Sequence, residues 1–141
     1  MFMKSLLLIL SLTSNTIPAQ KTGDILRIEF NSLTRGYQQL VVITADSIKI
    51  STHARGTEEN KSIKNKDWIH IIKPLKNVSL SDIAELKSPT MKRAYDGARH
   101  STITITTKSE TYSHSFDDED PHDKLKPLLK IILDTKKKVS K

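Results

Sequence analysis

Two segments near the start of the chain alternate between hydrophobic and polar residues, which is typical of strands with one buried face. A run that is apolar on both faces, Leu40–Ile43, lies between them and predicts a third strand. Gly36 and Asp46 favour turns at the two junctions, because glycine tolerates positive φ and aspartate bonds its own backbone. We predict a three-stranded meander over residues 24–30, 37–44 and 47–53, then a charged loop over 54–62 and a short edge strand near Ile63.

An apolar stripe at helical spacing then predicts a first helix. Asn65 is its expected N-cap, and Pro74 should end it because the residue before a proline avoids helical backbone. A second short helix follows and completes a helix pair. The stripe residues are Trp68, Ile71, Ile72 and Leu75 in the first helix, and Leu80, Ile83 and Leu86 in the second.

The last third of the chain predicts a hairpin and a C-terminal helix. Alternation returns over residues 102–107 and 112–116, around a short polar loop. Asp120 is the expected helix cap before Pro121, and Pro127 moves the start of the regular helix to about Lys126. The apolar stripe of this helix is Leu125, Leu128, Leu129, Ile132 and Leu133.

Strands joined by short loops pair antiparallel, and the helical stripes must be buried against a sheet face. We therefore predict a two-layer α+β fold. Its sheet has five or six mainly antiparallel strands, the meander plus the C-terminal hairpin, with the helix pair and the C-terminal helix on one face. We expect one domain over residues 20–134 and a basic, frayed tail over 135–141.

Residues 1–19 have the three parts of a cleavable signal peptide. Lys4 is followed by the mostly apolar run Leu6–Leu12, and Ala19 offers a small residue at the cleavage site. The apolar run is shorter than the roughly 20 residues that span a bilayer. We therefore expect an exported protein, periplasmic or secreted, without stable membrane insertion after cleavage.

Composition narrows the possible chemistry. The 141 residues include no cysteine, which excludes disulfides, thiolate metal sites and a cysteine nucleophile. The formal charge is +7, but export separates the protein from the chromosome, and only 5% of the residues are aromatic. Few aromatic side chains are therefore available to stack on nucleic-acid bases, and we expect no nucleic-acid partner. The four isolated glycines form no phosphate-binding loop, so no cofactor is expected.

The chain resembles small bacterial proteins of unknown function that carry signal peptides. The resemblance covers nearly all of residues 25–134 and implies export and an α+β fold, with no activity attached. The segments that carry it are Ile28–Phe30, Thr34–Tyr37, Trp68, Pro89–Ala98, Ile103–Thr107, Phe116–Asp117, Pro121 and Leu125–Leu128.

The segment Lys92–His100 concentrates side chains suited to binding. Its arginines could hold a carboxylate or phosphate through two parallel hydrogen bonds, and loops on a rigid scaffold often carry binding residues. A structural alternative stays open, in which Asp96 and Gly97 form a turn, the tyrosine packs over the sheet edge, and an arginine pairs with the aspartate or a backbone carbonyl. The candidate binding residues are Arg93, Tyr95, Asp96, Arg99 and His100.

A second polar segment, His114–Asp123, combines two histidines with several carboxylates. Its spacing matches neither a calcium loop, which needs a glycine, nor a helical two-histidine motif. We therefore predict no metal site.

Without a complete catalytic set, the sequence favours a non-catalytic binding module in the cell envelope or outside the cell. Its expected partner is a protein or an anionic envelope component. Two alternatives stay open. One is a small hydrolase-like enzyme that uses His100 with Asp96 or His114 with Asp117. The other is a purely structural envelope protein.

Overall fold

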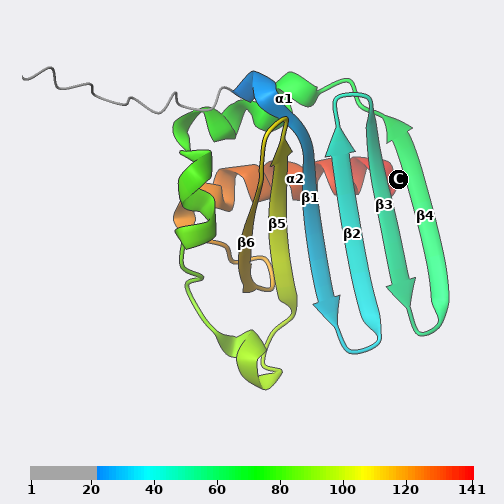
Figure 1. Ribbon diagram of the computed structural model, residues 1–141. Helices are drawn as coiled ribbons and strands as arrows, with labels where there is room; N and C mark the ends of the chain where they lie inside the picture. The colour runs from blue at the N-terminus through cyan, green and yellow to red at the C-terminus, as the bar shows by residue number, and fades with distance from the viewer. Residues whose placement is uncertain (1–21) are drawn as a thin grey trace, which may run out of the picture.

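Six antiparallel strands form a single sheet in a computed structural model that describes residues 22–141 (Figure 1). The predicted signal peptide lies outside the described residues. Along the sheet the strand order is β4-β3-β2-β1-β5-β6, so the meander and the C-terminal hairpin meet where β1 pairs with β5. The strands are β1 (Ile25–Thr34), β2 (Tyr37–Thr44), β3 (Ser47–Ala54), β4 (Thr57–Lys64), β5 (His100–Thr107) and β6 (Thr111–Asp117).

Short helices connect the two halves of the sheet, and one longer helix ends the chain. The α-helices are α1 (Trp68–Ile72) and α2 (Lys126–Val139). The 3-10 turns are η1 (Thr22–Asp24), η2 (Lys73–Asn77), η3 (Leu80–Glu85), η4 (Lys92–Tyr95) and η5 (Asp123–Leu125). The predicted helix pair is therefore one five-residue α-helix followed by 3-10 turns, of which η3 packs against the edge strand β6.

The predicted α+β fold is confirmed, and the sheet has the larger of the two expected strand numbers. The prediction of a charged loop over residues 54–62 was wrong, because most of this segment is strand β4. All eight residues of β4 are exposed, so the strand has no hydrophobic alternation by which the sequence could reveal it. A two-residue turn joins β3 to β4, with positive φ at both Arg55 and Gly56.

Two predicted helix caps were also wrong. Asn65 lies three residues before the helix and fixes the segment that leads into it. Its side-chain amide donates to Thr44 O at 2.6 Å, and its Oδ1 accepts from Asp67 N at 2.9 Å. Before the C-terminal helices the capping side chain is His122, whose Nδ1 accepts from Lys124 N at 3.2 Å. The expected start of the regular helix at Lys126, with Pro127 in its first turn, is confirmed.

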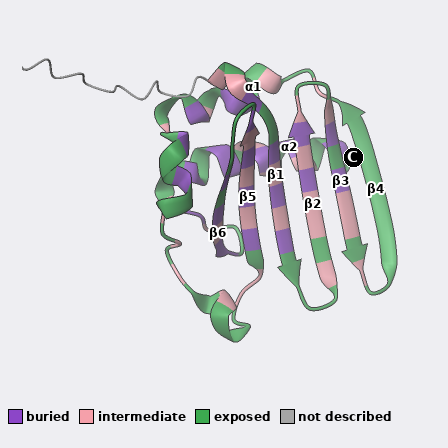
Figure 2. Cartoon of the chain, in the orientation of Figure 1, coloured by how far each residue is buried: buried purple, intermediate pink, exposed green. Residues whose placement is uncertain are grey.

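Helix α2 crosses one face of the sheet and closes the core (Figures 1 and 2). Inward residues of β1, β2, β3, β5 and β6 meet its apolar stripe, and Phe30 stacks on Phe116 with ring centroids 6.4 Å apart. The helix runs to Val139, and Thr135 and Val139 are both buried. The frayed tail expected over 135–141 is thus mostly helix, and the domain extends past the predicted boundary at residue 134.

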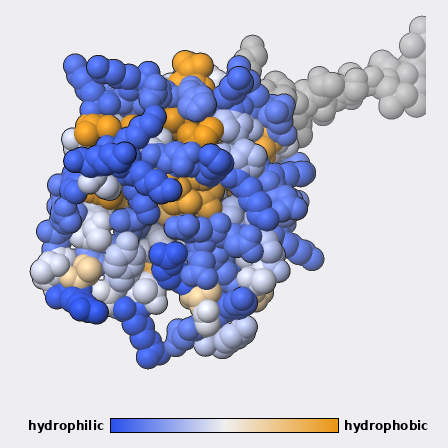
Figure 3. Space-filling model, turned by 180° about the vertical axis from the view of Figure 1, so that it is seen from behind, coloured by the Kyte–Doolittle hydropathy of each residue, from blue (hydrophilic) through white to orange (hydrophobic). Residues whose placement is uncertain are grey.

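The opposite face of the sheet has no helix over it in Figure 1, and on β5 and β6 it consists mainly of serine and threonine side chains. Hydroxyl pairs bridge β5 and β6 there, with Thr104 Oγ1 and Ser113 Oγ 3.0 Å apart and Thr102 Oγ1 and Ser115 Oγ 3.4 Å apart. Seen from the helix side, the surface is mostly hydrophilic, with separate hydrophobic patches (Figure 3).

Candidate functional site

All five predicted binding residues lie at one end of the sheet, the lower end in Figure 1. Strands β1, β3 and β6 end there, and β2, β4 and β5 begin there, so their connections share one edge. We call this surface the loop end. It consists of the turns Arg35–Gly36 and Arg55–Gly56, the loop over residues 91–99, the first residue of β5, and the turn Asp118–Glu119.

A buried ion pair anchors the 91–99 loop to the end of β6. Arg93 Nη1 lies 2.8 Å from Asp117 Oδ1, with the two side chains 13% and 3% exposed. Asp117 also accepts from the Thr90 hydroxyl, from Lys92 N at 2.7 Å and from Arg93 N at 3.2 Å. These hydrogen bonds outweigh the cost of burial and hold the pKa of Asp117 well below its usual range.

Arg93 therefore does not present its guanidinium as the sequence suggested. The same Nη1 contacts Ser88 Oγ and Thr90 O, each at 3.2 Å. An arginine with its charge matched inside the fold stabilises the loop and is poorly placed to hold an external anion. Part of its side chain lines a cavity of about 410 Å³ beside β6, together with Ser88 and His114.

The tip of the loop is held in one conformation by its own backbone. Asp96 has the left-handed conformation with φ of 59°, and Gly97 N donates to Lys92 O at 2.8 Å to close the turn after η4. A Cβ at Gly97 would lie 2.8 Å from Cε2 of Tyr95, so the absence of a side chain there lets the tyrosine ring lie over the turn. The expected turn at Asp96–Gly97 is present, but Tyr95 is 72% exposed and does not pack over the sheet edge.

Contacts between turns join the loop end into one surface. Arg35 Nη2 contacts Asp96 Oδ2 at 2.8 Å, and Arg55 N donates to Gly36 O at 3.1 Å. Arg99 donates to Asp118 Oδ1 from its backbone N at 3.0 Å and from Nε at 3.4 Å. Among residues 22–141 the non-glycine residues with positive φ are Arg55, Asp96 and Asp118, all of them at this end. Such conformations persist where the surrounding structure enforces them, often at binding sites.

The exposed residues at the loop end are apolar as well as charged. Tyr95 and Met91, which is 57% exposed, belong to the same loop, and Leu33 of β1 lies opposite His100 of β5 in the strand register. Tyr95, Asp96 and His100 are exposed, and Arg99 is partly buried. Leu33, Met91 and Arg35 were not predicted for this surface, because nothing in their local pattern distinguishes them from ordinary strand and turn residues.

The two histidine–aspartate pairs proposed for catalysis are not brought together by any hydrogen bond among the described residues. Asp96 binds Arg35 instead. His114 and Asp117 are three residues apart on a strand, so their side chains point to opposite faces. His114 is buried, with Nδ1 3.1 Å from Leu86 O and Nε2 accepting from His122 N at 3.1 Å. Burial lowers the pKa of His114 below its ordinary value of 6.5.

The carboxylates of the second polar segment form ion pairs with arginine and lysine side chains of the same chain. Asp118 and Glu119 lie near Arg99, and Asp120 and Asp123 near Lys126. Within residues 22–141, no three His, Asp or Glu side chains are grouped so as to hold a metal ion.

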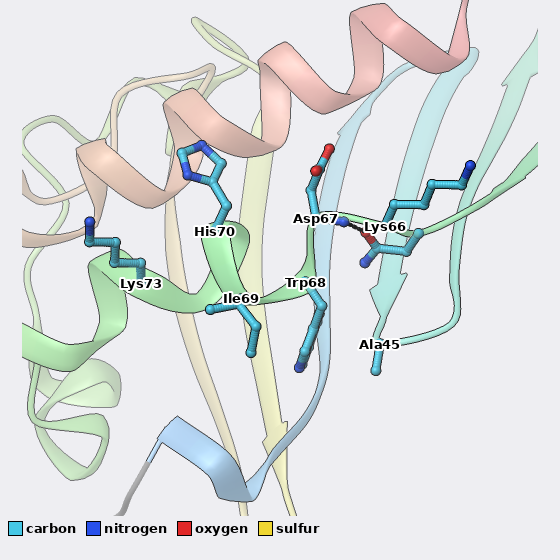
Figure 4. Close-up of a pocket in the computed structure, with 8 residues that line it drawn as sticks. Ala45, Lys66, Asp67, Trp68, Ile69, His70 and Lys73 are labelled. Carbon is cyan, nitrogen blue, oxygen red and sulfur yellow. Dashed lines mark hydrogen bonds between the residues drawn. The ribbon is translucent and has the colours of Figure 1, made fainter.

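The end of the sheet opposite the loop end carries a cavity of about 520 Å³ (Figure 4). Residues at the start of α1, including Trp68 and Ile69, line it together with Ala45 of the turn between β2 and β3. The helical stripe placed Trp68 in the core, but in the structure this side chain is only partly buried. Helix α1 is short and continues as the tighter 3-10 turn η2. The spacing of the apolar residues did not predict this.

No helix in the described part of the chain is long and apolar enough to cross a membrane. Comparison with protein-family models, with curated proteins and with solved structures gave no match for this chain.

Proposed function

We propose that this protein is an exported, non-catalytic binding domain that contacts a protein partner through its loop end. The observation that carries the proposal is Tyr95, which is 72% exposed on a loop fixed at its base by the buried Arg93–Asp117 pair. Tyrosine and arginine are enriched among the residues that dominate binding energy at protein interfaces. A side chain that is already held in place loses little conformational entropy when it binds.

The mixture of apolar and charged side chains at the loop end favours a protein partner. Arg35 is matched by Asp96, and Arg99 by Asp118 and Glu119, so these two arginines leave little unbalanced positive charge. The remaining exposed surface includes the apolar side chains of Tyr95 and Met91. Exposed Arg55 and Lys92 form no ion pair among the described residues, so the surface mixes apolar side chains, matched ion pairs and unpaired cations, and such a mixture is typical of protein interfaces.

Export is supported by the signal-peptide pattern of residues 1–19. We expect protein isolated from the source cells to begin at Gln20. N-terminal sequencing of the native protein tests this, and an N-terminus at Met1 in all of the mature protein would contradict it.

The binding proposal is tested by capture from the native envelope fraction with residues 20–141, which contain every element that the structure describes. A partner retained by the wild type should be lost by Tyr95→Ala, with a dissociation constant raised roughly 30-fold for a residue worth about 2 kcal/mol. The matched control is Lys108→Ala, an exposed change in the hairpin loop at the other end of the sheet. Equal capture by wild type and Tyr95→Ala, or no saturable partner at all, would refute the proposal.

Arg93→Glu is unsuitable for this experiment, because it would place two carboxylates together in the buried pair and disturb the fold. Arg99→Ala is the better second variant. Its ion pairs are partly exposed and worth less than about 1 kcal/mol, so loss of binding would report on the interface rather than on folding.

A further inference from the structure

The backbone of the edge strand β6 has hydrogen-bonding groups that no part of the described chain occupies. The turn bond from Thr107 N to Glu110 O, 2.8 Å long, makes these two residues a hydrogen-bonded pair of the β5–β6 hairpin. In an antiparallel ladder, hydrogen-bonded and non-hydrogen-bonded pairs alternate. Ser113 and Ser115 therefore point their N–H and C=O groups away from β5, and no segment within residues 22–141 bonds to these groups.

The cavity of about 410 Å³ lies along this edge of the sheet, and its volume is within the roughly 300–1,000 Å³ typical of ligand sites. Ser113–Ser115 form one wall. The opposite wall comes from the end of η3 and the segment that follows it, beside β6 (Figure 1). Leu86 and Met91 make part of that wall apolar. The cavity therefore combines unpaired backbone groups on one side with apolar side chains on the other.

The first residues of η4 close the cavity at the C-terminal end of β6. The Asp117 carboxylate accepts hydrogen bonds from Lys92 N at 2.7 Å and from Arg93 N at 3.2 Å, which holds these two residues against the strand. A polypeptide that pairs with Ser113 and Ser115 therefore has to end near Asp117. The cavity suits the terminus of a chain, whereas addition of a full-length strand to β6 stays blocked.

The charge of the cavity selects a carboxylate terminus. Lys87 and Arg93 line it, and no Asp or Glu among the described residues does. Asp117 neutralises Arg93, whereas Lys87 forms no ion pair with any residue between 22 and 141. Asp82 and Glu85 belong to the neighbouring η3 but do not line the cavity. The cavity therefore contains one cation without a counterion.

Lys87 also marks the end of the cavity at which this carboxylate lies. It precedes Ser88, whose Oγ lies 3.2 Å from Arg93 Nη1 at the closed end. A carboxylate terminus at that end requires the peptide to run in the same direction as β6, as a parallel strand. A terminal amine at the same place would be repelled by Lys87, because like charges brought together at an interface weaken binding.

We propose that this cavity binds the extended C-terminus of another polypeptide, which adds as a short parallel strand to the edge of β6. The peptide backbone bonds to the free N–H and C=O groups of Ser113 and Ser115, and Lys87 pairs with the terminal carboxylate. Leu86 and Met91 contact an apolar side chain near the end of the peptide. Strand addition supplies affinity through the backbone, and the neighbouring side chains supply selectivity. Tyr95 does not line the cavity, so this proposal does not rest on the one for the loop end.

The test uses two pools of short peptides with randomised C-terminal residues, one pool with free carboxylates and the other with C-terminal amides. Residues 20–141 are immobilised and incubated with each pool, and we expect selective retention from the free-acid pool. Mass spectrometry identifies the retained sequences, and fluorescence anisotropy of a labelled member measures its dissociation constant. Amidation of that same sequence should raise the dissociation constant about tenfold, because Lys87 loses its charged partner.

Lys87→Gln should weaken binding of the free-acid peptide about tenfold and leave binding of its amide unchanged. The matched control is Lys108→Gln, at an exposed lysine outside the cavity, which should change neither. Ser115→Pro removes an N–H that takes no part in the ladder, a change that an edge strand tolerates. It should weaken binding of both peptides about tenfold, because a backbone hydrogen bond is lost and the proline ring occupies the edge. Tyr95→Ala should bind both peptides as the wild type does, which separates this proposal from the one for the loop end.

The proposal is overturned if the protein retains the free-acid pool no better than the amide pool, or if Lys87→Gln binds free-acid peptides as tightly as the wild type. Amide hydrogen exchange provides a second measurement that needs no substitution. The N–H groups of Ser113 and Ser115 should exchange more slowly when the peptide is bound. Unchanged exchange at both residues would place the peptide elsewhere and would equally overturn the proposal.

Discussion

Replacement of Asp117 by asparagine tests the anchor of the loop end most directly. The change keeps the volume of the side chain and removes its charge, so the guanidinium of Arg93, 13% exposed, remains without a counterion. Breaking a buried ion pair from one side costs about 3 kcal/mol or more. The amide adds a geometric conflict. One carboxylate oxygen faces Lys92 N and the Thr90 hydroxyl, and the other faces Arg93 N and Nη1, so an NH₂ group would meet a backbone N–H in either orientation.

We expect Asp117→Asn to lower the free energy of unfolding by about 3 kcal/mol, of which roughly 1 kcal/mol reflects the lost hydrogen bonds. With a slope of about 1.5 kcal/mol per molar urea, the unfolding midpoint at neutral pH should fall by roughly 2 M. The matched control is Asp118→Asn, since the Asp118 carboxylate is half exposed and its contact with Arg99 is 3.4 Å. It should cost less than about 1 kcal/mol.

The pH dependence provides an independent check of the same pair. The pKa of Asp117 is lower in the folded protein than its ordinary value of 3.8, so its stabilising contribution is complete above that value and is lost as the pH falls below it. The wild type should therefore lose more stability than Asp117→Asn between about pH 5 and pH 2. Equal midpoints for the two proteins at neutral pH, or parallel losses in acid, would show that the ion pair does not anchor the loop.

Three further predictions follow from other buried or crowded positions. Burial lowers the pKa of His114 below 6.5, so protonation favours the unfolded state, and the free energy of unfolding should fall as the pH drops from about 7.5 to 5.5. In urea titrations His114→Gln should reduce this dependence of stability on pH. An unchanged pH dependence would contradict the lowered pKa of His114. Gly97→Ala should displace the Tyr95 ring, because the new Cβ would lie 2.8 Å from it, and should weaken partner binding several-fold while the melting temperature changes little; unchanged binding would argue against a preorganised tyrosine. Deleting residues 135–141 removes the buried Thr135 and Val139 and should lower the free energy of unfolding, measured by denaturation, by about 2 kcal/mol. A frayed tail could be removed without this loss.

The fold was largely predictable from the sequence because its core obeys simple periodicities. Strands β1, β3, β5 and β6 alternate, and α2 carries a continuous apolar stripe, since each has one face against the core. Strand β4 escaped prediction because it lies at the sheet edge and buries no side chain. The helix caps were mispredicted because Asn65 and Asp120 have the right chemistry but other partners: Asn65 bonds to Thr44 across the fold, and Asp120 lies near the Lys126 side chain.

The sequence predicts the loop that carries the candidate residues but not the contacts that each of them makes. A dense polar segment with an Asp–Gly pair predicts a turn, and residues 96–99 do form a connection between η4 and β5. Which arginine faces inward depends on Asp117, which is 24 residues further along the chain and adjacent only after β5 and β6 pair. The exposure of Tyr95, and its proximity to the turn containing Arg35, depend equally on tertiary structure.

The charged edge strand has a consequence for how this protein tolerates crowding. An open sheet edge offers unpaired backbone groups to other chains and can nucleate polymerisation. Strand β4 combines a fully exposed surface with glutamates and lysines, among them the Glu59–Lys61 pair at 3.2 Å, while η3 covers the other edge at β6. Addition of a foreign strand at β4 would force these charges into proximity with its side chains. The chain can therefore accumulate to high local concentration with its sheet unextended, because growth is opposed chemically at one edge and sterically at the other.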